Sequence, residues 1–277
     1  MINFRLDRFL TLHFFNRIVK KQSSVDNDRI PILMYHSISD EKETSHPYYH
    51  VNTSQAVFDA HMRYLHENNY AVISLADLKS SFNTKNLFQH VVITFDDGLY
   101  DFLTNAFPIL KKYNFGATVF LPTGFIHNAR LSFNGRKCLT WNEVRKLSSE
   151  GINFGSHTVT HPQLSNLSTK GIENEIKLSK YRIEDETGIT VKSFSCPYAF
   201  PENKEFGITL RTLLEECGYT SGVTTRIGTA RKADDVFFQS RLPANSADDI
   251  LLFRAKLEGA YDWLSQPQRF IKRFKGK

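Results

Sequence analysis

The sequence predicts an α/β fold in which parallel strands form a closed or nearly closed barrel. Strand-like and helix-like patterns alternate along most of the 277 residues, and this alternation implies parallel pairing with right-handed crossovers. About seven such units occur, roughly one per 35 residues, which suits a barrel better than an open sheet. The length fits one large domain or two small ones.

Each expected strand is a short apolar or alternating run bounded by turn residues. In chain order the runs are Pro31–Ile38, Tyr70–Ser74, His90–Asp97, Gly116–Pro122, Asn153–His157, Lys192–Pro197 and Thr220–Thr224. The expected helices are Ser54–Asn69, Leu99–Tyr113, Trp141–Glu150, Ser168–Thr187, Phe206–Cys217 and Ala247–Leu264. Active sites of such barrels lie at the carboxyl ends of the strands, so a functional motif should follow a strand directly.

Two kinds of signal mark the helix boundaries. Thr140 and Glu143 have the spacing of a capping box, in which each residue hydrogen-bonds the backbone of the other. Gly188 and Gly218 stand where glycines commonly end helices.

The composition is that of a globular protein with a slight excess of positive charge. Hydrophobic residues make up 41% of the chain, and the formal net charge of +6 mildly favours an anionic partner. Basic residues cluster only at the two ends of the chain, so nucleic-acid binding is not expected. The three cysteines (Cys138, Cys196 and Cys217) lack CxxC spacing, which argues against a disulfide framework or a zinc knuckle.

Residues 1–29 are predicted to form a basic amphipathic segment and a linker, followed by a catalytic domain over residues 30–277. Residues 1–21 hold five basic side chains and one acidic one, with apolar residues at helical spacing. Such a helix lies either on a membrane surface or against the domain, and the sequence favours neither. Residues 22–29 (QSSVDNDR) are typical of a linker. No convincing secretory signal is seen, so the expected location is cytoplasmic or peripheral on a membrane.

The first candidate for chemistry ends an expected strand, in the run VVITFDDG from Val91 to Gly98. Two carboxylates, Asp96 and Asp97, stand at the end of this run. Such residues can cap the following helix. Alternatively, one carboxylate can bind a metal while its neighbour acts as a base.

A second candidate follows the expected strand Asn153–His157, in the run GSHTVTHP. His157 and His161 are four residues apart and can point the same way on one helical turn, where they would bind a single metal. Such pairs also arise by chance in a chain with ten histidines. Two others, His61 and His66, are five apart in an expected helix and are predicted to lie at the surface.

Together, Asp97, His157 and His161 form a set of two imidazoles and one carboxylate. Three protein ligands with an open position are typical of a catalytic rather than a structural metal. Such a metal polarises a carbonyl group and lowers the pKa of bound water. Asp96 is then the expected base for that water.

These motifs, with the run FSCPY at Phe194–Tyr198, resemble those of the polysaccharide deacetylase family, the NodB-homology proteins of carbohydrate esterase family 4. The resemblance extends in order from about Pro31 to Arg241. It implies a distorted (β/α)7 barrel that hydrolyses N-acetyl groups on sugars. It also implies a divalent metal, usually zinc and sometimes cobalt or nickel.

The resemblance also implies a role for each matching residue. Asp96 would be the catalytic base. Pro197 and Tyr198 would line the substrate groove, and the backbone N–H of Tyr198 would help the metal to stabilise the tetrahedral oxyanion. The metal ligands would be Asp97, His157 and His161.

The chain departs from the family pattern in its later motifs. The third motif usually carries an arginine that pairs with the base carboxylate, and Ser195 occupies that place. Its loss is expected to raise the pKa of Asp96 or to loosen its orientation, unless Arg241 replaces it after the strand-like run Phe237–Ser240. The tryptophan-bearing fourth motif is also unclear in Arg231–Phe238.

The family's late histidine motif is absent, because no histidine follows His161. The run ILMYHS near the N-terminus supplies Leu-x-x-His instead, which resembles a circularly permuted branch that includes exopolysaccharide poly-N-acetylglucosamine deacetylases. His36 is therefore predicted to be the general acid that protonates the leaving amine, with His127 as the runner-up. Without the resemblance, His36 would be interpreted as a buried polar residue at a strand end.

These features favour a metal-dependent N-deacetylase that acts on an N-acetylated glycan or glycolipid. Two alternatives stay open: a deformylase or other amidase for a lipid-linked amino sugar, and a catalytically inactive carbohydrate-binding module. Retention of both Asp96 and His36 argues against the inactive module. The expected cofactor is one divalent metal, zinc or else cobalt or nickel. The expected partners are the sugar substrate and, through residues 1–21, a membrane surface.

Overall fold

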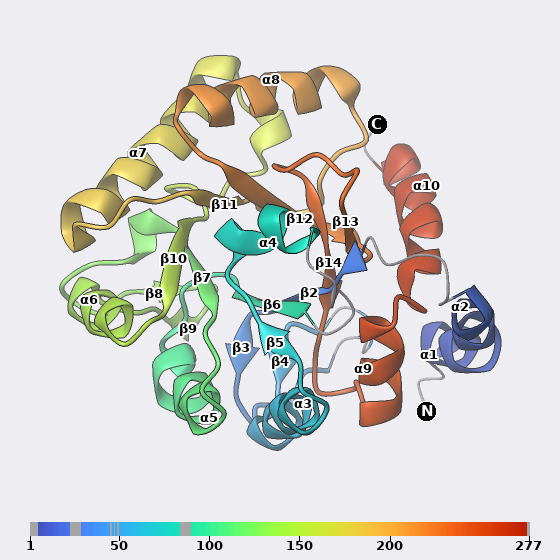
Figure 1. Ribbon diagram of the computed structural model, residues 1–277. Helices are drawn as coiled ribbons and strands as arrows, with labels where there is room; N and C mark the ends of the chain where they lie inside the picture. The colour runs from blue at the N-terminus through green and yellow to red at the C-terminus, as the bar shows by residue number, and fades with distance from the viewer. Residues whose placement is uncertain are drawn as a thin grey trace.

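The computed structural model describes residues 5–22, 29–44, 46, 48, 50–83 and 90–275, and its centre is a closed barrel of seven parallel strands (Figure 1). In chain order the strands are β2 (Ile32–Tyr35), β6 (His90–Phe95), β7 (Thr118–Leu121), β10 (Asn153–Ser156), β11 (Ser193–Ser195), β12 (Ser221–Ile227) and β14 (Gln239–Pro243). Around the ring they follow the order β2, β14, β12, β11, β10, β7 and β6, and β6 pairs with β2 to close it. The predicted seven-stranded α/β barrel is confirmed.

The ring differs from the expectation in one member. The strand predicted at Tyr70–Ser74 is reduced to β5 (Ala71–Val72), which pairs with β6 outside the ring. The seventh strand of the ring is instead β14, which lies between β2 and β12 and which the sequence indicated only through Phe237–Ser240. β14 follows β12 after residues 228–238, a described stretch that contains β13 (Ala230–Arg231) and no helix. The strand–helix alternation that revealed the other strands is therefore missing at this point.

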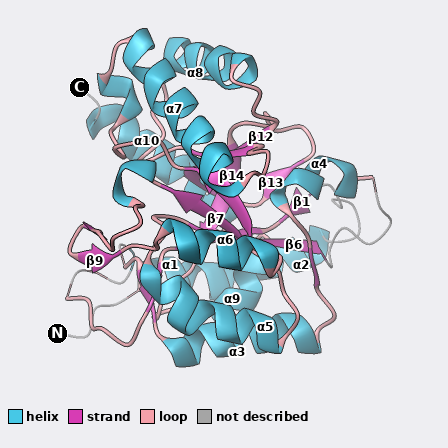
Figure 2. Ribbon diagram, turned by 90° about the vertical axis from the view of Figure 1, so that its left-hand side faces the viewer, coloured by secondary structure: helices cyan, strands magenta, loops and turns pink. Residues whose placement is uncertain are grey.

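Helices surround the barrel, and Figure 2 shows them on both sides of the strands. Four of them lie close to their predicted ranges: α3 (Gln55–Glu67), α6 (Trp141–Ser149), α7 (Thr169–Thr187) and α8 (Lys204–Glu216). The helix expected over Leu99–Tyr113 contains the π-helical turn η5 (Phe102–Ala106) followed by α5 (Phe107–Lys112). α9 (Ile250–Leu257) covers part of the last predicted range. The single helix expected over Ala247–Leu264 is instead divided into α9 and the short 3₁₀ helix η8 (Asp262–Leu264). Further strands and helices include β1 (Arg29–Ile30), β3 (Ser37–Ile38), β4 (Asn52–Thr53), α4 (Leu78–Ser81), β8 (Ser132–Phe133), β9 (Arg136–Lys137) and α10 (Ser265–Lys275).

The helix-boundary signals are found in place. Glu143 accepts a hydrogen bond from the backbone N–H of Thr140 at the start of α6, at 2.8 Å. α7 ends at Gly188, whose φ of 71° lies in the left-handed region that a residue with a β-carbon rarely adopts.

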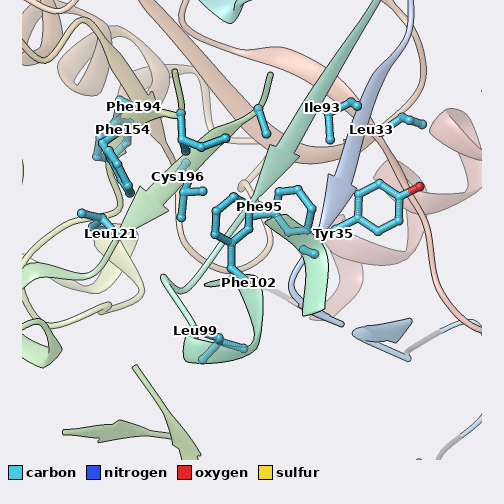
Figure 3. Packing of buried hydrophobic residues seen from close by; sticks show 14 of the residues in the cluster. Leu33, Tyr35, Ile93, Phe95, Leu99, Phe102, Leu121, Phe154, Phe194 and Cys196 are labelled. Carbon is cyan, nitrogen blue, oxygen red and sulfur yellow. The ribbon is translucent and has the colours of Figure 1, made fainter. Parts of the chain in front are cut away.

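The main hydrophobic core lies between the barrel and its helices. Successive residues of a strand face opposite ways, so on β6 Ile93 and Phe95 point to the helix layer and Thr94 points into the barrel. Phe95 packs on Tyr35 and on Phe102, with ring centroids 5.4 and 4.8 Å apart (Figure 3). This aromatic group supports the carboxyl end of β6, where the paired aspartates follow.

The barrel interior has an apolar end and a polar end. A small cluster fills the end at which the strands begin, and it is covered by α4 (Figure 1). Its members are Ile30, Ile32, Leu75, Leu78, Phe82, Val92, Phe120, Val223 and Ala230. Towards the carboxyl ends the interior holds polar groups instead, including the hydroxyl of Thr94 and the guanidinium of Arg241.

The N-terminal segment forms a helix that packs on the outside of α9 and η8. Three pieces follow one another, α1 (Leu6–Leu10), the π-helical turn η1 (Thr11–Phe15) and α2 (Asn16–Gln22). Thr11 accepts a hydrogen bond from the indole N–H of Trp263 at 3.0 Å, and Phe15 stacks on the same indole at 4.8 Å. Most of the predicted linker, residues 23–28, lies outside the described residues. Within the described chain, no helix is both long enough and apolar enough to cross a membrane.

Candidate active site

The residues expected to carry chemistry meet at the carboxyl ends of the strands. Asp96 and Asp97 follow β6, His157 and His161 follow β10, and His36 follows β2 directly. Within the described residues, one group of three or more potential metal-binding side chains is found, and it consists of Asp97, His157 and His161. The chain therefore gathers at one rim the candidates that the motifs had indicated separately.

These three residues are arranged as ligands of one cation. The Oδ1 atom of Asp97 lies 3.6 Å from Nε2 of His157 and 3.6 Å from Nε2 of His161. Zinc ligands at about 2.0–2.2 Å in a tetrahedral arrangement stand roughly 3.4 Å apart. The Asp97 oxygen is buried and has no hydrogen-bond partner within the described chain. A divalent metal would supply that partner, so the residues fit such an ion.

The electrostatics of the group also suit a metal. Burial, together with the neighbouring Asp96, raises the pKa of Asp97 to about 7. Burial lowers the pKa of His157 to about 3 and lowers that of His161 as well. Neutral imidazoles are the form that binds metals, and a divalent charge would favour the ionised form of Asp97.

The two histidines lie on a loop, so the expectation that they share a helical turn is wrong. Residues 157–163 belong to neither a helix nor a strand, and His161 has a φ of 54°. The Nδ1 atom of His157 donates to the backbone carbonyl of Ser195 at 2.7 Å. This bond fixes the tautomer and leaves Nε2 to face Asp97.

Residues in the left-handed backbone region are concentrated around this loop. Seven described non-glycine residues have a positive φ, and three of them are asparagines. The other four are Asp97, Thr158, His161 and Tyr198. Conformations of this kind cost about 1–3 kcal/mol each and are retained where the surroundings impose them.

Glu175 of α7 holds the loop between the two histidines in place. Its carboxylate accepts hydrogen bonds from the N–H of Val159 at 2.7 Å and from the N–H and hydroxyl of Thr160 at 2.9 and 2.7 Å. The hydroxyl of Thr158 accepts the N–H of His161 at 3.0 Å. Nothing in the sequence singles out Glu175, because it is an ordinary acidic residue in a helix whose register against the loop is a tertiary feature.

Arg241 supplies the positive partner of Asp96. Its guanidinium donates to both carboxylate oxygens at 2.8 and 2.7 Å, and also to the hydroxyl of Ser195 at 3.1 Å. Burial alone would raise the pKa of Asp96, but the charge and hydrogen bonds of Arg241 hold it well below its usual range. Arg241 thus stands in for the missing arginine, which is the case in which no raised pKa of Asp96 was expected.

His36 also lies beside the carboxylate of Asp96. Its Nε2 atom lies 3.9 Å from Oδ2 of Asp96, and its side chain is 20% exposed. Burial lowers its pKa, an effect that Asp96 partly opposes. The runner-up, His127, is exposed and lines a shallow depression beside Leu178 and Tyr181 of α7. Of the two histidines, His36 is the one that the structure places beside Asp96.

Aromatic side chains flank the metal ligands at the rim. The ring of His161 lies between those of Phe133 and Tyr198, with centroid distances of 4.9 Å to each. Tyr198 is 52% exposed, whereas Pro197 is buried, so of the two predicted groove residues only Tyr198 presents its side chain to solvent. Phe133 belongs to the hairpin of β8 and β9, which the sequence analysis did not identify.

Comparison with known proteins places this site in a defined group. A family model described as polysaccharide deacetylase matches residues 84–222. YxkH of Bacillus subtilis, a protein named as a polysaccharide deacetylase, is 31% identical over 232 residues, which cover 83% of this chain and 76% of YxkH. A poly-β-1,6-N-acetyl-D-glucosamine N-deacetylase of Staphylococcus aureus is 29% identical over 135 residues, or 48% of this chain and 44% of that protein.

A solved structure of a deacetylase has a similar fold. The deacetylase PplD of Streptococcus pyogenes, solved in complex with acetate, superposes with a TM-score of 0.71 and is 25% identical. The superposition covers 83% of this chain and 98% of that structure. Nearly the whole of that structure thus has a counterpart in the chain described above.

Proposed function

The chain belongs to the polysaccharide deacetylase family, and on that premise we propose that it is a metal-dependent N-deacetylase of an N-acetylated glycan. The observation that carries the proposal is the cluster of Asp97, His157 and His161 beside the ion-paired Asp96, at the barrel rim. A binding module would have no need of a buried, ion-paired carboxylate beside a set of metal-binding side chains. The position of His36 next to Asp96 also supports an active enzyme, because a binding module would not need an acid beside a base.

Asp97, His157 and His161 would hold the metal. When bound, a divalent ion polarises the acetyl carbonyl and makes water a stronger nucleophile near neutral pH. The hydrogen bond that His157 donates to the Ser195 carbonyl, and those that the Glu175 carboxylate accepts from the loop, hold the ligand atoms in position. Such support is typical of groups that surround metal ligands.

The side chains of the site provide the proton transfers. Asp96 removes a proton from the attacking water as the oxygen bonds to the carbonyl carbon, and Arg241 keeps its carboxylate ionised and oriented. The backbone N–H of Tyr198 would donate to the oxyanion of the tetrahedral intermediate. His36 gives a proton to the amide nitrogen as the carbon–nitrogen bond breaks, which releases acetate and a free amine.

The site lies at the solvent-exposed rim of the barrel, which suits a sugar unit within a polysaccharide. Tyr198 is exposed next to the ligand His161, and its ring offers an apolar face to a sugar ring. The Staphylococcus aureus relative is named for poly-β-1,6-N-acetyl-D-glucosamine, which makes N-acetylglucosamine polymers the first substrates to test. A formyl group would fit the same chemistry, so a lipid-linked amino sugar is the alternative substrate.

The experiment combines metal analysis with release assays. Purified protein should contain close to one divalent metal per chain, and it should release acetate from at least one member of a panel of N-acetylated oligosaccharides. Metal removal should abolish release, and added zinc, cobalt or nickel should restore it. Formate release from N-formylated sugars without acetate release would favour the alternative. A metal-loaded protein that releases neither acid would contradict the proposal.

A further inference from the structure

The N-terminal helix buries several polar side chains against the domain, beside Phe15, which stacks on Trp263. Asp7 accepts a hydrogen bond from the hydroxyl of Tyr261 at 2.7 Å, and Arg5 bonds Asp7 and lies 3.5 Å from Asp248. Thr11 is fully buried on the same side. Helices normally bury apolar residues and expose polar ones.

The outer face of this helix is apolar. Leu6 and Phe14 are 56% and 55% exposed, and Phe9 and Ile18 are 41% and 49% exposed. Phe9 and Phe14 contact each other in an edge arrangement, with centroids 6.2 Å apart. These four residues form a stripe along the helix, which we call the outer stripe. Contiguous exposed apolar surface of this kind is typical of an interaction site.

Basic residues are concentrated in the two terminal segments of the sequence, and the first of these segments bears the outer stripe. Arg17 is exposed beside it, and Lys20 and Lys21 follow in the sequence. The C-terminal helix α10 lies on the same flank of the barrel (Figure 1). Residues 1–22 and 265–277 together contain ten of the 35 Lys and Arg residues but one of the 29 Asp and Glu residues. Outside these two segments the chain therefore carries a net negative charge.

We propose that the outer stripe docks on the surface of an anionic phospholipid bilayer. Apolar side chains at the level of the headgroups, flanked by basic residues, are the features of helices that lie in the membrane interface. Each basic residue near an anionic leaflet contributes about 1 kcal/mol. A protein partner would need a complementary groove, whereas a bilayer accepts a convex, exposed helix as it stands. The helix packs on α9, so docking leaves the barrel intact.

The test compares variants of the full chain in vesicle co-sedimentation. Phe14→Gln/Ile18→Gln removes two members of the outer stripe with a residue that favours helices. The control, Leu178→Gln/Tyr181→Gln, removes two side chains of similar exposure, 55% and 51%, from α7. Vesicles contain either phosphatidylcholine alone or phosphatidylcholine with one quarter phosphatidylglycerol.

The unmodified chain and the α7 control should bind the anionic vesicles, and more strongly than the neutral ones. The outer-stripe variant should bind at least about tenfold more weakly, because two large apolar side chains no longer leave water, while its melting temperature stays near that of the control. Failure of the unmodified chain to bind, or equal binding by both variants, would overturn the proposal. So would a change of oligomeric state in light scattering without a change in vesicle binding, because the stripe would then be covered by a second copy.

Discussion

At the scale of single residues, the ion pair between Asp96 and Arg241 is the most consequential contact of the site. Both side chains are buried. Asp96 directly follows β6 and Arg241 lies on β14, and the two residues are 145 positions apart in sequence. A buried carboxylate with one partner removed is strongly destabilising, by about 3–5 kcal/mol. The pair therefore links the chemistry of the site to the stability of the barrel.

The first prediction concerns this pair. Asp96→Asn should lower turnover by about 10²–10⁴-fold, because the general base is lost, and should retain the metal, because Asp97 and the two histidines are unchanged. It should also lower the melting temperature, since Arg241 is left as an unpaired buried cation. The measurements are acetate release, metal content and thermal unfolding.

The double variant Asp96→Asn/Arg241→Met separates the two effects. It should recover much of the lost stability, because no unpaired charge is left in the barrel, but none of the turnover. Loss of metal in Asp96→Asn with an unchanged rate per bound metal would mean that the roles of the two aspartates are exchanged.

The second prediction concerns His36. His36→Ala should retain the metal and lose most turnover, because protonation of the leaving amine needs a group of suitable pKa beside the site. The limb of the pH–rate profile that reports the acid should disappear. His127→Ala is the control: His127 is exposed beside Leu178 and Tyr181 of α7, so this variant should behave as the unmodified protein. Near-normal turnover of His36→Ala would refute its role.

At the scale of elements, the strands that bear motifs were predictable because they are local apolar runs that end in polar residues. β14 was indicated only weakly, because no helix precedes it. The importance of its residue Arg241 becomes evident only from the ion pair with Asp96, which follows β6. The loop of His157 and His161 was predicted as a helical turn from spacing alone. Spacing cannot reveal the left-handed residues within the loop, which depend on a carboxylate from α7.

The third prediction tests that carboxylate. Glu175→Ala removes three hydrogen bonds to the loop, so Thr158 and His161 can relax from their left-handed conformations. The affinity for zinc should fall about 10–100-fold, as measured by competition with a chromophoric chelator. Glu173→Ala is the matched control, because Glu173 lies on the same helix and, among the residues that the structure describes, forms its ion pairs with the exposed Lys170 and Lys177. Equal zinc affinity in both variants would show that Glu175 does not position the ligands.

At the scale of the whole molecule, His61 joins the first part of the chain to the last. It was predicted to lie at the surface, but it is fully buried, because α3 turns it towards the core. Its Nδ1 faces the hydroxyl of Tyr35 at 3.0 Å and its Nε2 donates to the carbonyl of Asp248 at 2.9 Å. Its ring stacks on Phe253 at 3.9 Å. Such packing depends on elements far apart in sequence, which helical spacing alone does not place.

The fourth prediction follows from this burial. Burial lowers the pKa of His61 to about 4, although Asp248 partly opposes the shift and Lys256 adds to it. The unfolded chain has the ordinary value near 6.5 and takes up the proton first, so this contribution to stability is complete above pH 6.5 and declines as the pH falls towards 4. Between pH 7 and pH 5 the loss amounts to about 2 kcal/mol.

His61→Gln should therefore show a smaller decrease in the free energy of unfolding between pH 7 and pH 5 than the unmodified protein. The measurement is denaturant unfolding of the metal-loaded protein at both pH values. His66→Gln is the control, because His66 is exposed on the same helix, and it should keep the full decrease. An unchanged decrease in His61→Gln would place the pH dependence elsewhere in the molecule.

The closure of β2 onto β6 and β14 has a consequence for protein engineering. A closed ring has no first strand, so His36, Asp96 and Arg241 remain neighbours whichever of the three strands a gene encodes first. New chain ends made in exposed loops are expected to be tolerated as long as all seven strands of the barrel are present. Evolution and the laboratory can thus cut and rejoin the chain at different points and still assemble the same reaction centre.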